Sequence, residues 1–179
     1  MAVPDFICLQ CGRCCTNLIK ESQGTRKGLP LFPKERKLFS NDVVKQYIGI
    51  GRNSTDRKFK VISYQMMENT CPNLQNNECK IYDNRPVACR AFPLYPQFTI
   101  GEGITMKIDP ACTALKKLGI HYPHEGEFFT EGSLKNELLY VDELSKISSQ
   151  AYRNIKRTWI FDLKSDKWIR FRDIVKSHE

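Results

Sequence analysis

The sequence lacks long apolar runs, because no uninterrupted hydrophobic stretch approaches the roughly 20 residues that a membrane-spanning helix needs. The first residues, Met1 to Phe6, have neither a basic start nor an apolar run, so a secretory signal is not expected. These absences predict a soluble, cytoplasmic protein with no membrane partner. With 179 residues, 41% of them hydrophobic, the chain is long and apolar enough to fold around its own core.

Motifs of familiar catalytic sites are also missing. The sequence has no recognisable Ser-His-Asp set, no paired-carboxylate motif and no nucleotide-binding loop. Gly49-Ile50-Gly51 begins like a dinucleotide-binding loop, but the third glycine is absent and we expect no strand before it. His121 and His124 flank a proline and are more typical of a surface loop than of metal ligands. We assign no catalytic residues, leave cofactor-binding residues unknown, and leave open whether the chain is an enzyme.

Cysteine, in contrast, is abundant and clustered. The eight cysteines are Cys8, Cys11, Cys14, Cys15, Cys71, Cys79, Cys89 and Cys112. The segment 8–15 alone holds four thiols in eight residues, and no core-packing pattern requires that density, since a core helix or strand needs bulk at its own period. Cys-x-x-Cys-Gly is typical of a metal-binding knuckle, in which Gly12 lets backbone N–H groups approach a thiolate closely.

Disulfides are the structural alternative, because the number of cysteines is even. A reducing cytoplasm keeps thiols reduced, however, and bonds within Cys-x-x-Cys or between Cys14 and Cys15 would close strained loops that stabilise little. A thioredoxin-like redox role would place the motif at a helix start after a strand, rather than at the beginning of this chain with two more thiols behind it. Metal binding explains the pattern better.

Four cysteines complete one tetrahedral zinc site or hold one iron–sulfur cluster such as [4Fe–4S], so eight suffice for two centres or for one centre and a spare set. Consecutive side chains usually diverge, and Cys14 and Cys15 can therefore serve different centres. All eight cysteines are candidate ligands, and the predicted cofactor is zinc or an iron–sulfur cluster in one or two centres. Ligand type does not separate the two, because both accept four thiolates.

The net charge of +8 and the pI near 9.1 invite a nucleic-acid interpretation. Metal ligation deprotonates cysteines, however, and two four-thiolate zinc sites would cancel about half of that excess. Several cations lie close to cysteines in the sequence, where they would stabilise thiolates: Arg13, Lys80, Arg85 and Arg90. Nucleic acid therefore stays an alternative that we do not favour, and a protein partner stays unknown.

The local patterns predict short elements, with a helix or a pair of short helices over 34–47 and a short strand over 58–64. Further along, the expected elements are a turn at 75–78, a short helix after Arg85-Pro86 that carries Cys89 and is capped by Asp83 or Asn84, a hairpin of 98–100 with 104–108, and a helix over 113–118. From 133 onwards, apolar residues three or four apart, the last of them Trp159, indicate one long helix face. The tail 159–172 mixes aromatics with cations, and we interpret it as an amphipathic strand or helix rather than a platform for single-stranded nucleic acid.

The expected fold class is α+β. A small, irregular, cysteine-rich body over 8–115, stapled by metal and containing short helices and a β-hairpin, is packed by a long C-terminal helix. That helix belongs to a helical extension over 133–179, and the whole chain 1–179 forms a single domain.

The order and spacing of the cysteines carry a resemblance. Cys8-x-x-Cys11-Gly12-x-Cys14-Cys15 precedes Cys71-Pro72-x-Leu74, then Cys79-x-Ile81-Tyr82-x-x-Arg85-Pro86-x-x-Cys89-Arg90-x-Phe92-Pro93, and finally Cys112. Over about 8–115 this resembles the CxxCxxCC family, whose members are described as zinc- or iron-chelating, and a similar cysteine module occurs in the flagellin lysine N-methylases. The resemblance implies metal or cluster binding in a bacterial or archaeal cytoplasmic protein and supplies no reaction. Residues 116–179 add nothing to it.

The sequence thus favours a protein with a cysteine-ligated metal or iron–sulfur centre that is structural or handles electrons or iron. Two alternatives stay open. One is a cluster-dependent enzyme, such as a protein related to the methylases, which would need an open iron site with three cysteine ligands. The other is a zinc-stabilised module that binds nucleic acid through the basic tail.

Overall fold

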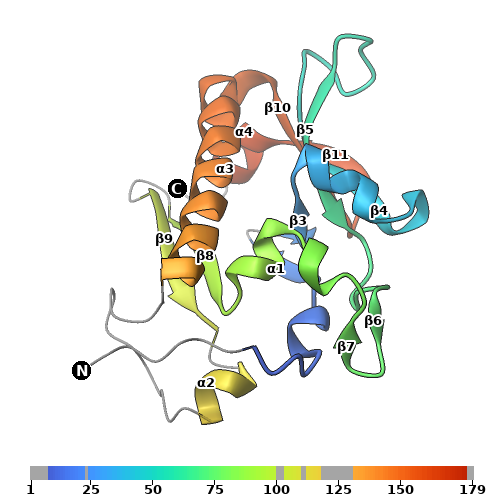
Figure 1. The fold of residues 1–179 in the computed structure, drawn as a ribbon. Helices are drawn as coiled ribbons and strands as arrows, with labels where there is room; N and C mark the ends of the chain where they lie inside the picture. The colour runs from blue at the N-terminus through green and yellow to red at the C-terminus, as the bar shows by residue number, and fades with distance from the viewer. Residues whose placement is uncertain (1–7, 23, 100–102, 110–111, 118–130, 177–179) are drawn as a thin grey trace. The chain divides into compact units, whose positions relative to one another are not determined.

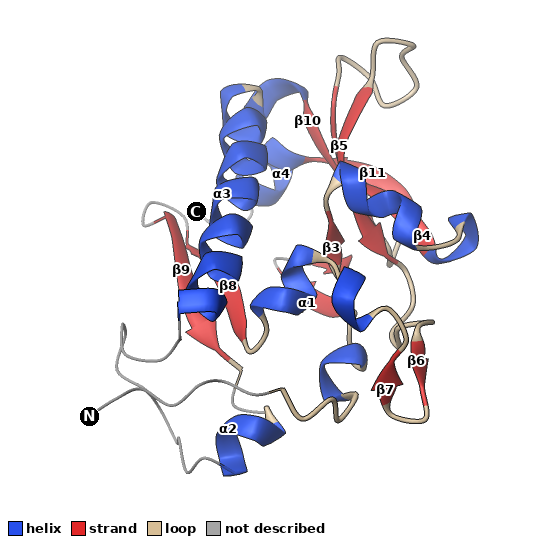
Figure 2. Cartoon of the chain, in the orientation of Figure 1, coloured by secondary structure: helices blue, strands red, loops and turns tan. Residues whose placement is uncertain are grey.

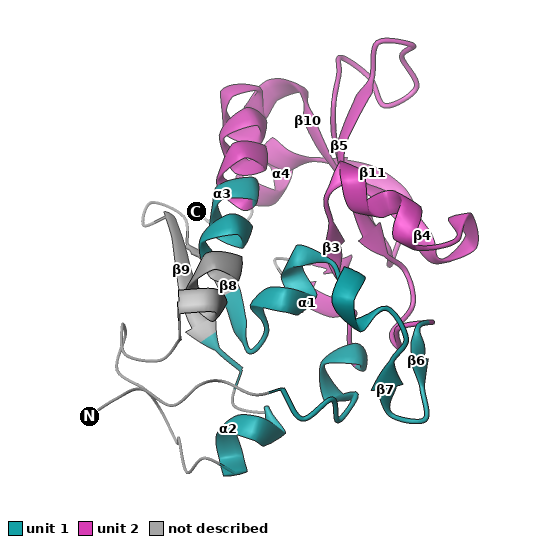
Figure 3. Cartoon of the chain, in the orientation of Figure 1, with its two compact units in different colours: residues 1–16, 73–143 teal, residues 17–72, 144–179 magenta. Residues whose placement is uncertain are grey.

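A computed structural model describes residues 8–22, 24–99, 103–109, 112–117 and 131–176 of the chain (Figure 1). Short helices and antiparallel strands alternate along it, followed by one long helix, which confirms the α+β fold class (Figure 2). The chain divides into two compact units (Figure 3). We call residues 1–16 and 73–143 the cysteine unit, and residues 17–72 and 144–179 the sheet unit. Single-domain organisation stays a prediction.

The sheet unit contains a five-stranded antiparallel sheet in the order β11-β10-β4-β5-β3. Its strands are β3 (Pro30–Leu31), β4 (Val44–Ile50), β5 (Lys60–Met66), β10 (Thr158–Asp162) and β11 (Lys167–Arg170). A separate hairpin pairs β1 (Lys20–Ser22) with β2 (Thr25–Lys27). The remaining elements are the 3-10 helices η2 (Pro33–Leu38), η3 (Asn41–Val43) and η5 (Ile155–Arg157), and the helix α4 (Phe171–Lys176).

Two buried polar side chains connect the strands of this unit. Gln65 has no exposed surface; its Oε1 accepts from Gly28 N–H, and its Nε2 donates to the carbonyl oxygens of Gln46 and Phe161. Asp162 accepts from the Arg26 N–H at 2.7 Å and from groups of the turn that follows it. A buried polar group is tolerated only when its hydrogen bonds are made, so both residues hold strands from distant parts of the sequence together.

The cysteine unit consists of short elements. They are η1 (Arg13–Cys15), the hairpin β6 (Leu74–Gln75) with β7 (Glu78–Cys79), η4 (Tyr82–Asn84), α1 (Val87–Ala91), the hairpin β8 (Leu94–Thr99) with β9 (Gly103–Ile108), and α2 (Thr113–Lys117). Cys112, Ala114 and Leu115 form a buried cluster against which Phe92 and Ile108 pack. The boundary between the units falls within α3 (Glu131–Arg153).

Several local predictions are confirmed. The strand near 58–64 is β5, the hairpin around 98–108 is β8 with β9, and the helix predicted over 113–118 is α2. The turn expected at 75–78 joins β6 to β7, where Asn76 and Asn77 both have positive φ, as a type I′ turn requires. The helix that carries Cys89 is α1, but Pro86 occupies its N-cap position, so the expected cap by Asp83 or Asn84 is wrong.

Two predictions of helix are wrong over part of their length. The pair of short helices ends at Val43, because Val44 to Ile50 form a central strand between β5 and β10, so a strand does precede Gly51. The long helix ends at Arg153, and the predicted helical extension continues as β10 and β11 before α4. In both places β-branched and aromatic residues gain hydrogen bonds from strands far away in the sequence, and this overrides the helical spacing. In the tail, predicted as an amphipathic strand or helix, the chain forms β10, β11 and the start of α4, but β10 is buried along almost its whole length and is not amphipathic.

His121 and His124 lie outside the described residues. Among the helices of the described part, none combines the length and the apolar character that a membrane crossing requires.

Candidate metal centre

The first two cysteines sit in turns whose backbone N–H groups point at sulfur. Gln10 N–H donates to Cys8 Sγ over 3.4 Å, and Arg13 N–H donates to Cys11 Sγ. The chain then turns into η1, with Cys15 N–H bonded to the Gly12 carbonyl oxygen at 2.9 Å. Such N–H···S contacts stabilise a thiolate, and the segment has the local geometry of the predicted metal-binding knuckle.

Gly12 is required at this point for two reasons. Its φ is +71°, a left-handed conformation that is costly for residues with a Cβ atom. A Cβ at this position would also lie 2.8 Å from Leu74 Cδ1 and 3.1 Å from the Asn77 carbonyl oxygen. The β6–β7 turn therefore packs directly against the knuckle, and the missing side chain makes that approach possible.

Cys112 is placed at the start of α2. Its carbonyl accepts from Lys116 N–H at 3.3 Å, and the backbone N–H groups of Ala114 and Leu115 donate to its sulfur. The side chain is only 6% exposed. Burial raises the pKa of the Cys112 thiol, the two N–H groups oppose that rise, and the charges of Cys8 and Cys11 add to it. Burial thus disfavours the thiolate form of Cys112, and a bound metal cation would stabilise that form.

Thr113 connects α2 to the knuckle. Cys11 Sγ and Thr113 Oγ1 are hydrogen-bonded at 3.5 Å, although they are 102 residues apart in the sequence. This hydrogen bond is the main cause that lowers the pKa of the Cys11 thiol, and the Arg13 N–H assists it, whereas Cys14 acts in the opposite direction. These surroundings favour the thiolate form of Cys11, which is the form that a metal ion binds.

Four thiols of the cysteine unit thus influence one another electrostatically. The charges of Cys8 and Cys11 act to raise the pKa of Cys112, and the charge of Cys14 acts to raise the pKa of Cys11. In the described part of the chain no three His, Cys, Asp or Glu side chains converge as a ready coordination shell. The four thiols are linked by these charge interactions. Their chemistry fits zinc or iron, which take thiolate ligands.

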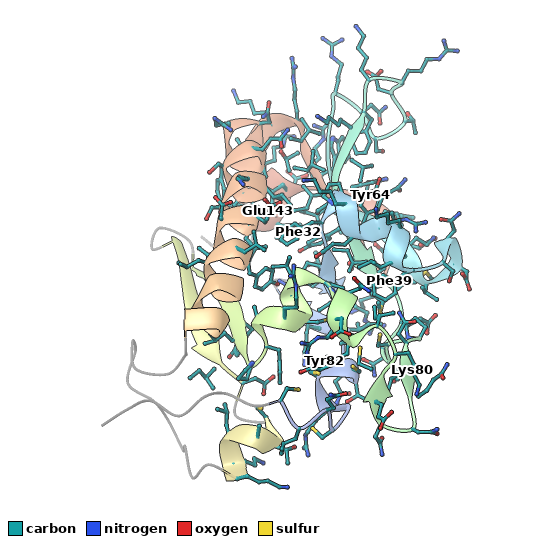
Figure 4. All side chains as sticks on the ribbon, in the orientation of Figure 1. Phe32, Phe39, Tyr64, Lys80, Tyr82 and Glu143 are labelled. Carbon is teal, nitrogen blue, oxygen red and sulfur yellow. The ribbon has the colours of Figure 1, made fainter. Side chains whose placement is uncertain are left out.

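Tyr82 and Arg85 border this group. The Arg85 guanidinium stacks on the Tyr82 ring at 3.6 Å, and its Nε donates to the Tyr82 carbonyl oxygen at 2.7 Å. The Tyr82 hydroxyl hydrogen-bonds with Cys8, and sulfur-bearing side chains lie around this ring in Figure 4. Burial raises the pKa of Tyr82, Cys8 adds to that rise, and Arg85 opposes it. An aromatic ring and a cation thus stand beside the first thiol, where a cation stabilises thiolate and a ring limits access of water.

The other four predicted ligands belong to several elements. Cys15 is buried in η1, Cys79 ends β7 opposite Leu74, and Cys89 lies within α1. Cys71 is buried and belongs to the sheet unit. All eight cysteines are within the described residues, and no disulfide joins any of them there. The different burial of Cys14 and Cys15 accords with the divergence expected of neighbouring side chains.

Sequence reasoning missed Thr113. The available signal was its position directly after Cys112 at a predicted helix start, where hydroxyl side chains commonly meet polar groups. Its contact with Cys11, however, depends on tertiary structure.

Comparison with known proteins identifies the pattern independently. A family model named CxxCxxCC, described as "Putative zinc- or iron-chelating domain", matches residues 7–114. Neither a curated relative nor a solved structure matched the chain. The matched segment includes all eight cysteines and more than half of the sequence. The chain belongs to the CxxCxxCC family of zinc- or iron-chelating domains.

Proposed function

We propose that the chain binds zinc or iron through cysteine thiolates alone, and that Cys8, Cys11, Cys14 and Cys112 form one four-thiolate centre. The observation that carries the proposal is the Cys11–Thr113 hydrogen bond beside Cys112, because it brings the N-terminal knuckle to the start of α2. Cys15, Cys71, Cys79 and Cys89 stay candidate ligands on the grounds of the sequence pattern. The proposal places the protein in a reducing compartment such as the cytoplasm, where these thiols persist.

Backbone groups beside three of the four thiols stabilise the ligating form. Backbone N–H groups donate to Cys8, Cys11 and Cys112, so each sulfur has a partner that stabilises its negative charge. A bound zinc ion would serve as a structural cross-link, and a bound iron–sulfur cluster would accept and release electrons. The role of this chain's own residues is to hold the sulfurs, limit the access of water and balance their charge.

Binding requires the four sulfurs to move onto one point. The knuckle and the start of α2 are positioned by backbone hydrogen bonds, so closure requires side-chain rotation and movement of these segments. Since a thiol releases its proton on ligation, metal uptake by this group releases protons and is weakened by acid. We propose a centre that is structural or handles electrons or iron.

The test begins with composition. The full chain is purified without oxygen or added metal, and zinc, iron and acid-labile sulfide are measured per chain. Zinc without sulfide supports a structural thiolate site, and iron with sulfide supports a cluster. Protein that contains none of these, and takes up neither zinc nor iron on reconstitution, would overturn the proposal.

The ligand set is tested by substitution. Cys11→Ser and Cys112→Ser should each remove the same equivalent of metal, and the double variant should remove no more than either single variant. Thr113→Ser, which keeps the hydroxyl, is the matched control and should retain metal. Additive losses would place Cys11 and Cys112 in different centres, and full retention in either single variant would exclude that cysteine as a ligand.

A further inference from the structure

Charge is divided unequally between the two units. The sheet unit has 20 Lys and Arg against nine Asp and Glu, a net charge of +11, whereas the cysteine unit has eight against 11, a net charge of −3. Seven of the eight cysteines are in the acidic unit. Thiolates formed by these cysteines would add negative charge to the unit that is already acidic. They do not explain the excess of cations in the sheet unit, although the net charge of the whole chain allowed that explanation.

Within the sheet unit, six cations gather at one end of the sheet. We call this group the basic end: Arg52, Arg57, Lys58, Lys60, Lys156 and Arg157. Gly51 N–H donates to the Arg157 carbonyl oxygen at 2.9 Å, and Ile50 pairs with both Thr158 and Lys60. These contacts bring η5, the end of β4 and the start of β5 together. Nitrogen-tipped side chains extend from the loop that joins β4 to β5 (Figure 4).

The basic end has little to offset its charge. All six side chains are exposed, and within the described part of the chain none of them forms an ion pair. The cations of this unit that do pair are others, such as Arg26 with Glu21 and Lys45 with Asp166. Asp56 lies in the same loop, but its carboxylate accepts the Lys58 backbone N–H and so organises the loop. An exposed cluster of like charge destabilises its own fold slightly and attracts a polyanion.

The aromatic residues beside the basic end already contact other groups of the sheet unit. Trp159 donates its indole N–H to the Gly51 carbonyl oxygen at 3.0 Å, and the Arg170 guanidinium covers its ring at 4.2 Å. Phe59 meets Trp168 edge to face at 4.9 Å. Single-strand binders need free rings on which bases stack, whereas a duplex presents two rows of phosphates and a groove wide enough for a two-stranded hairpin. The arrangement suits phosphates better than unpaired bases.

We infer that the basic end is a docking surface for duplex nucleic acid, which it contacts through the phosphate backbone without reading sequence. The β4–β5 hairpin supplies Arg52, Arg57, Lys58 and Lys60, and η5 supplies Lys156 and Arg157. This surface lies entirely within the sheet unit, and its function does not depend on which metal the cysteines hold.

Salt dependence is the primary test. Binding of the full, metal-loaded chain to a fluorescent duplex of about 20 base pairs is measured by anisotropy as salt rises from about 50 to 200 mM. Six phosphate contacts predict a loss of affinity of about 10³-fold over this range. Duplex RNA and duplex DNA of two unrelated sequences should show similar slopes, because the contacts are to phosphates.

Two triple variants separate the basic end from general charge. Arg52→Gln, Arg57→Gln and Lys156→Gln together should reduce the slope of log affinity against log salt by about three. Lys20→Gln, Lys34→Gln and Lys37→Gln remove the same charge from exposed positions of the same unit and should leave the slope unchanged. Lys34 and Lys37 lie in η2, which precedes β4 in the chain, whereas all residues of the basic end follow the last residue of β4. The charge-preserving variant Arg52→Lys with Arg57→Lys should bind like the wild type.

Other outcomes would overturn the inference. Equal effects of the two triple variants would mean attraction to the net charge of the chain without a docking surface. Tighter binding to a single strand than to its duplex would contradict the phosphate geometry. Binding to vesicles with anionic headgroups, without binding to duplex, would identify a lipid surface as the partner.

Discussion

Replacing Gly12 by alanine tests whether the knuckle depends on close approach of the β6–β7 turn. The substitution adds one methyl group at a residue with φ of +71°, where it would meet Leu74 Cδ1 at 2.8 Å and the Asn77 carbonyl oxygen at 3.1 Å. The left-handed conformation costs alanine about 1–2 kcal/mol. The leucine methyl can rotate away at little cost, but the backbone oxygen cannot, and we assign about 1 kcal/mol more to that contact.

Together the two costs destabilise the metal-binding conformation by about 2–3 kcal/mol. If the knuckle must keep its geometry to ligate, the affinity for zinc falls by about 30- to 140-fold, since about 1.4 kcal/mol corresponds to a factor of ten. Gly24→Ala is the matched control, because Gly24 has φ of +69° and nothing within 4 Å of an added Cβ. It should pay only the conformational cost and leave metal affinity unchanged.

Competition with a colour-forming zinc chelator measures the affinity, and urea unfolding measures the stability of each variant. The reasoning predicts that Gly24→Ala loses about 1–2 kcal/mol of stability and no affinity, whereas Gly12→Ala loses both. If Gly12→Ala binds zinc as tightly as Gly24→Ala does, the knuckle geometry is not what positions the ligands, and the proposed role of the N–H···S contacts is refuted.

Two further predictions concern the buried polar residues of the sheet unit. Gln65→Leu removes three hydrogen bonds and should lower the free energy of unfolding by about 3 kcal/mol in urea titration. Gln46→Leu, at an exposed position, should change that free energy by less than about 0.5 kcal/mol, and equal effects of the two variants would mean that the buried amide holds no strands together. For Asp162, burial alone would raise the pKa, but hydrogen bonds from Ser165, Arg26 and Lys164 hold the pKa below its ordinary value of 3.8. The contribution of Asp162 to stability is therefore complete above pH 3.8 and is lost as the pH falls through the lower pKa of the folded state. Asp162→Asn should flatten the acid side of a plot of unfolding free energy against pH. An unchanged acid slope would contradict this assignment.

How far the sequence predicted the fold depends on how local each interaction is. The β6–β7 turn and α2 depend on residues within a few positions, such as the two asparagines with positive φ, and these elements were predicted. The strand β4 was mistaken for helix because Val44 and Tyr47 also fit a helical spacing. Its strand character comes from pairing with β5 on one side and with β10, more than 100 residues later, on the other, and no local pattern reports the second pairing.

The candidate site divides in the same way. Cysteine spacing and Gly12 predicted the knuckle, since a thiol-rich turn with a glycine requires only local geometry. The placement of Thr113 beside Cys11 was not predictable, because it depends on the path of the chain through the whole cysteine unit. The basic end was visible in the composition as an excess of cations, but its position needed the β4–β10 pairing that brings η5 beside the β4–β5 loop.

The interleaving of the two units in the sequence would give the proposed metal centre a specific role in folding. Residues 17–72 are inserted between the knuckle and the rest of the cysteine unit, so a centre that joins Cys11 to Cys112 closes a loop of about 100 residues. A cross-link across a loop of that length removes about 4–5 kcal/mol of conformational entropy from the unfolded chain, if the disulfide relation is applied to a metal. Within the cysteine unit, Cys112, Ala114 and Leu115 form a buried cluster at one end of this loop, so the cross-link would add to packing that already holds α2. The sheet unit instead has a five-stranded sheet closed by the Gln65 and Asp162 hydrogen bonds, all within its own residues. We therefore expect metal loss to loosen the cysteine unit first, and to leave the basic end folded and able to bind a polyanion.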